Sequence, residues 1–297
     1  MSSAPVLVTG ASGFIGSALV HRLLAGGAEV HGVSRRPPSA EGRGIVWHQA
    51  DLGDPDRVRA LVGGIRPARL FHLASAVSGR GDRDFVLPTL RDNLLSTVHL
   101  LLAAAESGVG RTILAGSMEE PEPGEAPSSP YSASKAAATL YGQLFSELYH
   151  LPVVHARIYM VYGPGQRDRT KVVPAAIRAA LAGEAPRLSS GARPVDWNFV
   201  DDVAEGLERL SEAPGLEGRR VELGSGELVT VRALVERISA LCGGPPPAIG
   251  ALPDRPLERV RRADAAATMA ATGWRARVGL DEGLRRTIAA LRSEEES

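Results

Sequence analysis

The chain of 297 residues contains a single cysteine, Cys242, and therefore cannot form an internal disulfide. No uninterrupted apolar stretch approaches the roughly 20 residues that a helix needs to cross a bilayer. The first residues also lack the basic leader and small-residue cleavage site of a secretion signal. These absences predict a cytoplasmic protein with no membrane segment.

Neither sign of charge is in excess, because 34 acidic residues balance 34 lysines and arginines to a formal net charge of zero. Such a balance is not typical of proteins that bind nucleic acid or anionic membranes. The seven histidines also lack the spacings of a metal site. We therefore expect neither nucleic acid, nor a membrane, nor a metal ion as a partner.

Short apolar runs alternate with helical stretches along the first 160 residues. The run Val6–Thr9 ends in glycines and is followed by apolar residues at helical spacing. Further strands are predicted at 29–33, 45–48, 69–73, 112–115 and 153–158, and the clearest helices at 92–106 and 131–149. Continuously apolar strands between helices indicate a parallel sheet covered on both faces. The sequence predicts an α/β fold with a doubly wound, Rossmann-type parallel sheet.

A glycine-rich loop lies between the first predicted strand and the first helix. Its glycines allow a tight turn, a close approach of the backbone to a pyrophosphate, and close packing of helix on strand. The free amides and the positive end of the helix dipole would hold the phosphates. The loop therefore predicts dinucleotide binding by Gly10, Ser12, Gly13, Phe14, Ile15 and Gly16.

The regular alternation weakens after Gly163-Pro-Gly165, and proline and glycine become more frequent, notably at 243–247. This change predicts a smaller carboxy-terminal lobe that binds substrate and is interleaved with the first domain. We assign residues 1–163 to the dinucleotide-binding domain, with 196–222 returning to it. Residues 164–195 and 223–297 form the predicted substrate-binding lobe. Asp201 and Asp202 precede a predicted helix and are interpreted as an N-cap.

The end of the second strand is where an acidic residue would bind the ribose of NAD, and an arginine the 2′-phosphate of NADP. The sequence there is Ser34-Arg35-Arg36, with no carboxylate before Glu41. These residues favour NADP(H), with NAD(H) as the alternative if both arginines simply point into solvent.

Tyr131 and Lys135 are one helical turn apart at the start of a predicted helix, so both lie on the same face. A lysine cation favours the phenolate, and we expect it to lower the pKa of Tyr131 towards a working range. The tyrosine could then exchange a proton with a carbinol or carbonyl oxygen. Ser117 ends the fifth strand at the edge where ligands bind in open α/β sheets, and it is the natural group to orient that oxygen.

The glycine loop, Ser117 and the Tyr-x-x-x-Lys helix resemble the NAD-dependent epimerase/dehydratase family of extended short-chain dehydrogenases. The resemblance covers essentially the whole chain, through the segments 51–52, 71–74, Asn93, 161–164, 200–203, 223–226, 273–274 and 283–287. It implies that Asp51 contacts the adenine. It also implies that the dinucleotide meets Asp51, Leu52, Leu73, Ala74, Ser75 and Asn93, besides Tyr131 and Lys135 of the catalytic helix.

Some residues depart from the family's pattern. Dehydratases of the family place an acidic pair directly after the catalytic serine or threonine, whereas this chain has Met118 and Glu119. Dehydration is therefore not expected, because elimination of water needs an acid and a base there. Met160 stands where an asparagine is usual, and Val195 where an arginine is common, with Arg193 nearby. The resemblance implies substrate contacts by Ser117, Met118, Glu119, Arg193, Arg255 and Arg259, the last two toward a pyrophosphate.

The leading hypothesis is an NAD(P)-dependent oxidoreductase that reduces a nucleotide-linked 4-keto-6-deoxy sugar. Tyr131 would give the proton, Ser117 would hold the reacting oxygen, and Lys135 would bind the nicotinamide ribose. An NAD-dependent nucleotide-sugar 4-epimerase is the alternative, since it needs no residue that this chain lacks. A carbonyl substrate without a sugar, or a dinucleotide sensor without catalysis, are more distant alternatives.

Two predicted helices carry apolar stripes, at Leu94, Leu95, Val98, Leu101 and Leu102, and at Leu140, Leu144 and Leu148. Packing against the sheet would explain them. The resemblance also implies a homodimer that forms through these two helices.

Overall fold

The computed structural model describes residues 4–36, 44–77, 81–254 and 259–295. The chain forms two compact units between which it passes repeatedly. The first unit comprises residues 1–158, 204–222 and 268–274, and the second comprises residues 159–203, 223–267 and 275–297. The boundaries expected from the sequence, at residues 163, 196 and 222, stay a prediction about the domains.

A seven-stranded sheet forms the centre of the first unit, in the order β3-β2-β1-β4-β5-β6-β9. Every pairing from β3 to β6 is parallel. This arrangement confirms the predicted doubly wound, Rossmann-type sheet. The strands are β1 (Val6–Thr9), β2 (Val30–Ser34), β3 (Ile45–Gln49), β4 (Arg69–His72), β5 (Arg111–Ser117), β6 (Val153–Ile158) and β9 (Arg220–Leu223).

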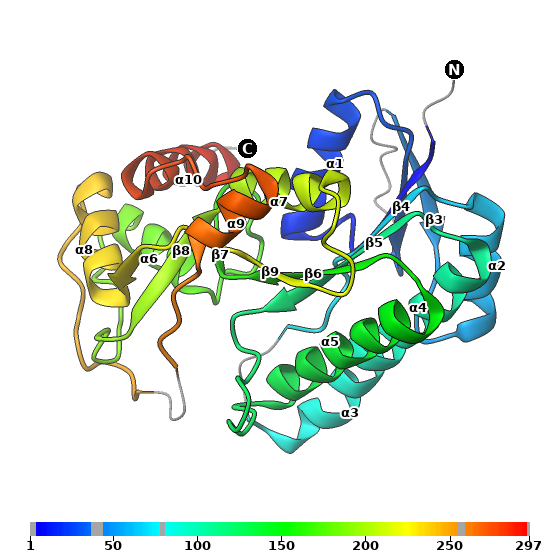
Figure 1. Cartoon of the computed structure of the whole chain (residues 1–297). Coiled ribbons are helices and arrows are strands. Elements are labelled where there is room, and N and C mark those ends of the chain that lie inside the picture. Colours follow the sequence, from blue (N-terminus) through cyan, green and yellow to red (C-terminus); the bar gives the residue numbers. More distant parts are fainter. Residues whose placement is uncertain (1–3, 37–43, 78–80, 255–258, 296–297) are drawn as a thin grey trace. The chain divides into compact units, whose positions relative to one another are not determined.

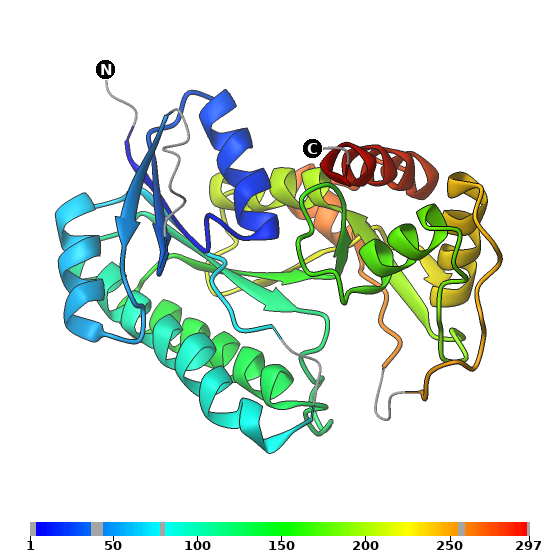
Figure 2. The same ribbon diagram turned by 180° about the vertical axis from the view of Figure 1, so that it is seen from behind.

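Helices cover both faces of this sheet. In Figures 1 and 2, α1 (Phe14–Ala25) lies on one face, whereas α2 (Pro55–Ile65), α4 (Ser96–Ser107) and α5 (Pro130–Tyr149) lie on the other. Strands β1 and β6 are buried along their whole length, because both faces of the sheet are covered there, whereas the edge strand β3 is partly exposed. On the first face, Arg22 of α1 donates to Glu208 of α7 (Val200–Glu212) at 2.5 Å.

Local signals in the sequence fix where the helices of the first unit begin and end. Asp54 accepts the amides of Asp56 and Arg57 as the N-cap of α2, which is one of the helical stretches expected between the predicted strands. Ser129 caps α5 by accepting the amide of Ser132, and Pro130 takes the first helical position. The helix predicted at 92–106 begins within the π-helical turn η2 (Leu90–Leu95) and continues as α4, and it is preceded by η1 (Arg83–Phe85) and α3 (Val86–Thr89).

Helix α5 packs unusually close to the sheet at Gly142. A Cβ atom there would lie 2.4 Å from the ring of His155 on β6 and 2.9 Å from Leu114 on β5. Burial lowers the pKa of His155 to about 4, and the charge of Arg220 acts in the same direction. The imidazole is therefore neutral at physiological pH and packs as a core residue. This contact holds the helix that carries Tyr131 and Lys135 against β5 and β6.

The second unit is built on a three-stranded sheet in the order β10-β8-β7, with β7 (Met160–Tyr162), β8 (Pro194–Phe199) and β10 (Leu228–Thr230). Its helices include α6 (Val172–Leu181), α8 (Val231–Cys242) and α10 (Leu280–Glu295), while α9 (Ala265–Thr272) spans a boundary between the units. Side chains from these elements, among them Tyr162, Trp197 and Leu284, form one apolar core.

Asp201 and Asp202 lie inside the first turn of α7, which begins at Val200, so the interpretation of this pair as an N-cap is wrong. Asp202 instead accepts the amides of Arg277 and Val278 within the second unit, at 3.1 and 2.9 Å.

In the described part of the chain, no helix combines the length and the hydropathy that crossing a membrane requires.

Candidate active site

The glycine loop joins β1 to α1 at the carboxyl edge of the parallel sheet. Gly10 has a φ of +68°, and a Cβ atom there would lie 2.7 Å from the backbone nitrogen of Ala74, which follows β4. At Gly16 a Cβ atom would lie only 2.1 Å from the carbonyl oxygen of Gly10. Both positions therefore need glycine, because the opposing atoms belong to the backbone and cannot turn away.

The amino end of α1 is open for an anion. Its N-cap residue is Gly13, which has no side chain to accept the first amides of the helix. The amides of Phe14, Ile15 and Gly16 are therefore available to phosphate oxygens, and the helix dipole favours negative charge there. The hydroxyl of Ser12 donates to Ser34 at 3.2 Å and ties the loop to the end of β2. This cradle fits the pyrophosphate of a dinucleotide.

Hydrogen bonds with Thr9 and Asn93 hold the residues that follow β4. Thr9 Oγ1 accepts the amide of Ala74 at 3.3 Å. Asn93 Oδ1 accepts the hydroxyl of Ser75 and the amide of Ala76, and Asn93 Nδ2 donates to the Ala76 carbonyl and to Ser134. These four bonds give Asn93 a positioning role, and its direct contact with a dinucleotide stays a prediction.

A cavity of about 690 Å³ lies beside the ends of β2 and β3. Arg35 donates to Asp92 at 3.2 Å, and Arg91 donates to Asp51. A hydrogen bond from the Gly53 amide, with the charge of Arg91, lowers the pKa of Asp51. Arg57 and Arg91 also line this cavity, and sequence reasoning missed both. The lining residues are Arg35, Gln49, Ala50, Asp51, Gly53, Asp54, Arg57 and Arg91.

Two other residues predicted for this region have more distant roles. Leu52 is buried, and its carbonyl accepts a hydrogen bond from His99 Nδ1 at 3.0 Å. The backbone amide of Arg36 donates to the hydroxyl oxygen of Ser34 at 3.3 Å, which forms a turn at the end of β2. Arg35 and Arg36 are both exposed, and Arg35 is the one that lines the cavity.

Ser117, Tyr131 and Lys135 lie together in the first unit, all of them buried. Ser117 is the last residue of β5, and Tyr131 lies in the first turn of α5 with Lys135 one turn further. Tyr131 forms a side-chain hydrogen bond with Ser117. Lys135 Nζ donates to the Ala115 carbonyl at 2.8 Å and lies 5.9 Å from the centre of the Tyr131 ring. The predicted trio is thus one cluster at the carboxyl end of β5.

The proton affinities in this cluster differ from the sequence-based expectation. Burial raises the pKa of Tyr131 to about 12, against the opposing effect of its hydrogen bond with Ser117. Burial also lowers the pKa of Lys135 to about 8. The expectation that the Tyr131 pKa falls is therefore wrong, because desolvation of the phenolate dominates. At neutral pH the phenol is protonated and can act as an acid.

The segment after Ser117 has one carboxylate that the sequence analysis did not single out. Met118 is buried and Glu119 half-buried, with the Glu119 amide donating to Ser117 Oγ at 3.1 Å. Glu120 is the residue that turns inward. Its carboxylate accepts the amide of Ser117 at 2.6 Å and the hydroxyl of Thr139 at 2.9 Å. The sequence shows two adjacent glutamates but does not show which of them is buried.

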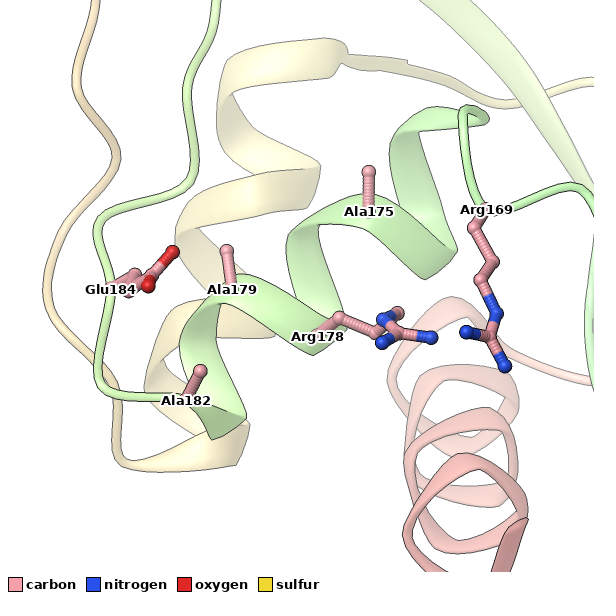
Figure 3. Close-up of a pocket in the computed structure, with 6 residues that line it drawn as sticks. All are labelled: Arg169, Ala175, Arg178, Ala179, Ala182 and Glu184. Carbon is pink, nitrogen blue, oxygen red and sulfur yellow. The ribbon is translucent and has the colours of Figure 1, made fainter. Parts of the chain in front are cut away.

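The residues predicted to bind substrate in the carboxy-terminal lobe lie in the second unit. Arg193 and Arg259 are half-buried, while Arg255 lies outside the described residues. Val195 is buried in β8, and Met160 begins β7. A separate hollow of about 370 Å³ lies along α6, where Figure 3 shows the guanidinium groups of Arg169 and Arg178 close together and Glu184 farther off.

Among the described residues, no cluster of histidine, cysteine and carboxylate side chains could hold a metal ion.

Two features define the class of protein. A glycine loop leads into a helix without a side-chain cap, and a serine, a tyrosine and a lysine lie together at the end of one strand of the same sheet. The protein is a dinucleotide-dependent enzyme of the extended short-chain dehydrogenase/reductase type. The model of the NAD-dependent epimerase/dehydratase family matches residues 6–224, and the chain belongs to this family.

Individual relatives span nearly the whole chain. A UDP-glucose 4-epimerase from Mycolicibacterium smegmatis is 32% identical over 97% of this chain and 98% of its own length. A probable dTDP-glucose 4,6-dehydratase from Sinorhizobium fredii is 31% identical over 95% of this chain and 91% of its own. The solved UDP-glucose 4-epimerase of Thermus thermophilus, in complex with NAD, superimposes with a TM-score of 0.84 at 31% identity, covering 97% of this chain and 99% of its own.

We predict that Gly16→Ala weakens the binding of NAD(P)H by at least about tenfold, since the new Cβ forces the Gly10 carbonyl out of the loop. Binding is measured by the change in nicotinamide fluorescence on titration. Gly64→Ala in α2 is the matched control, because no atom lies within 4 Å of its Cβ, and its affinity should equal that of the wild type. Wild-type affinity in a folded Gly16→Ala protein would contradict this assignment of the loop.

Proposed function

We propose that the protein reduces a nucleotide-linked keto sugar, of the 4-keto-6-deoxy class, with NADPH as the hydride donor. The observation that carries this proposal is the buried cluster of Ser117, Tyr131 and Lys135, in which the phenol stays protonated at neutral pH. Reduction of a ketone needs an acid at the carbonyl oxygen, and a protonated phenol supplies it.

Each residue of the cluster has a separate task in this reaction. Tyr131 donates its proton to the carbonyl oxygen as that oxygen becomes an alcohol. Ser117, which already hydrogen-bonds to Tyr131, holds the same oxygen in place. Lys135 binds the nicotinamide ribose and, in its charged form, stabilises the phenolate that remains. The bound dinucleotide supplies the hydride.

The choice of NADPH rests on the end of β2. No carboxylate follows β2 before the described residues end at Arg36, and Arg35, Arg57 and Arg91 line the adjacent cavity. Arginine suits the 2′-phosphate of NADP, because its guanidinium binds phosphate through paired hydrogen bonds. The Arg35 side chain is 66% exposed in its ion pair with Asp92, so this pair contributes little and Arg35 can turn to a phosphate.

The names of the relatives support a nucleotide sugar as substrate, since they act on UDP-glucose and dTDP-glucose. Arg193 and Arg259 of the second unit, together with Arg255, are the residues that we propose for the substrate. Dehydration is disfavoured here even though several relatives are dehydratases, because Met118 carries no group that exchanges a proton.

A second candidate is a nucleotide-sugar 4-epimerase. The 32% identity to the M. smegmatis UDP-glucose 4-epimerase, over 97% of this chain, favours it. An epimerase would use the same three residues in both directions of hydride transfer, with NAD held throughout the cycle.

Tyr131→Phe should lower turnover by about 100-fold or more in either reaction, since it removes the hydroxyl group that exchanges a proton with the substrate oxygen. Turnover is measured with candidate keto sugars by loss of NADPH absorbance, or with UDP-sugars by product analysis. Tyr141→Phe on the same helix is the control and should leave turnover unchanged, because Tyr141 is exposed. Full turnover in folded Tyr131→Phe protein would exclude the mechanism.

The dinucleotide that accompanies the purified protein separates the two candidates. We expect weakly held dinucleotide and a preference for NADPH over NADH, and we expect Arg35→Ala to weaken NADPH binding by about tenfold with little effect on NADH. Arg59→Ala is the matched control, since Arg59 pairs with Glu106 and does not line the cavity. Stoichiometric, tightly held NAD⁺ would instead establish the epimerase.

We further propose a homodimer formed by α4 and α5. Leu140 and Leu148 of α5 are 66% and 63% exposed. Leu95, at the end of η2, and Leu102, in α4, are exposed as well. Exposed leucines in such number mark an interaction surface. Other members of the predicted stripes, such as Leu101, are buried in the core of the unit.

Light scattering should give twice the chain mass of 31.2 kDa for the wild type. A Leu140→Glu/Leu148→Glu variant should give the mass of the monomer, because two charges on the surface cannot be buried against a second copy. A wild type that is monomeric at micromolar concentration would disprove the dimer.

A further inference from the structure

A buried carboxylate lies directly beside the catalytic cluster, and the proposed reaction gives it no role. Glu120 is 2% exposed. One of its oxygens accepts the amide of Ser117, at the end of β5, and the other accepts the hydroxyl of Thr139, on α5. The side chain therefore joins the strand that carries the serine to the helix that carries the tyrosine and the lysine.

The surroundings of Glu120 are shaped to receive it. At Gly116 a Cβ atom would lie 2.5 Å from the Glu120 carboxylate, so a side chain at 116 would expel it. Thr139 follows Tyr131 and Lys135 at intervals of four residues, which places all three on one face of α5. From the other side, the buried Arg157 donates to the Glu120 carbonyl at 2.8 Å. The loop is thereby fixed through both its backbone and its side chain.

We propose that Glu120 is a positioning residue of this site, whose carboxylate sets the spacing between Ser117 and the Tyr131–Lys135 face and lies beside that pair. This inference rests on the proposed function for its effect on turnover. Its effect on the charge of Lys135 can be observed without substrate or dinucleotide.

The charged and titratable groups around the pair are few. Glu120 and Glu119, from the segment after β5, both raise the pKa of Tyr131, after the larger effect of burial. Glu120 also supports the ammonium of Lys135 against the burial that lowers its pKa. From β4, His72 faces Lys135, but burial lowers the His72 pKa to about 3, so this ring is neutral between Thr9 and Thr97. Glu120 is therefore the group that favours the charged form of Lys135.

The sequence offers a direct readout, because it contains only two lysines, Lys135 and Lys171. Protein labelled with ¹³C at the lysine ε carbon gives one NMR signal for each, and a Lys171→Arg variant assigns them. Titration of the Lys135 signal with pH reports its charge in the full chain. Burial lowers the pKa of Lys135 to about 8, so a titration around this pH follows the change in its charge.

The test compares Glu120→Gln with the wild type. Glutamine keeps the shape and an oxygen for the Ser117 amide, while the hydroxyl of Thr139 can accept from its NH₂ group, so the variant retains both bonds. Loss of the negative charge should move the Lys135 titration to lower pH by roughly one pH unit. Glu147→Gln, an exposed position on α5, is the matched control and should leave the titration in place.

Turnover supplies the second readout. In Glu120→Gln, the loss of reductive activity at high pH should begin at lower pH, in step with Lys135. Thr139→Val keeps the charge but removes one bond to the carboxylate, so it should lower kcat by several-fold without moving the pH profile. A Lys135 titration that is unchanged in folded Glu120→Gln protein would overturn the inference. If Tyr131→Phe keeps full turnover, the proposed function fails, yet the NMR titration still decides the role of Glu120.

Discussion

The contact of α5 with the end of β5 is the interaction on which the rest of the site depends. Strand β5 is held in register between β4 and β6, so the position of Ser117 is set by the sheet itself. Helix α5 approaches the same strands closely because Gly142 leaves room for His155 and Leu114. Three side chains from two separate elements therefore meet with little freedom, as a catalytic geometry requires.

The same burial that fixes the site also sets its proton chemistry. A phenol and an ammonium group taken out of water each favour the neutral form, so Tyr131 and Lys135 both shift in the direction that burial dictates. A cationic neighbour alone would have shifted the phenol the other way. Tyr131 is therefore protonated at neutral pH and has a proton to donate, while its raised pKa makes it a weaker acid than a phenol in water.

The sequence predicts those parts of the protein that depend on short-range patterns. Apolar runs locate β1 to β6, and the glycine spacing locates the loop, because both reflect local backbone requirements. The Tyr131 pKa was mispredicted, since it depends on burial by residues far along the chain. Glu120, Arg57 and Arg91 were missed because only the folded chain shows which of several neighbouring charges is buried, as Glu120 is, or lines a cavity, as the two arginines do. Asp54 and Pro55 mark the start of α2, one of the helical stretches expected between the strands, although its bounds were not predicted.

The interleaved course of the chain has a consequence for how the protein can be divided. The first unit needs residues 204–222, which supply β9 at the free edge of β6, and α7, whose Glu208 pairs with Arg22. A fragment that stops at residue 158 would leave β6, buried along its whole length, as an exposed apolar edge prone to aggregation. Recombination between relatives at one junction therefore cannot exchange one unit and keep the other whole.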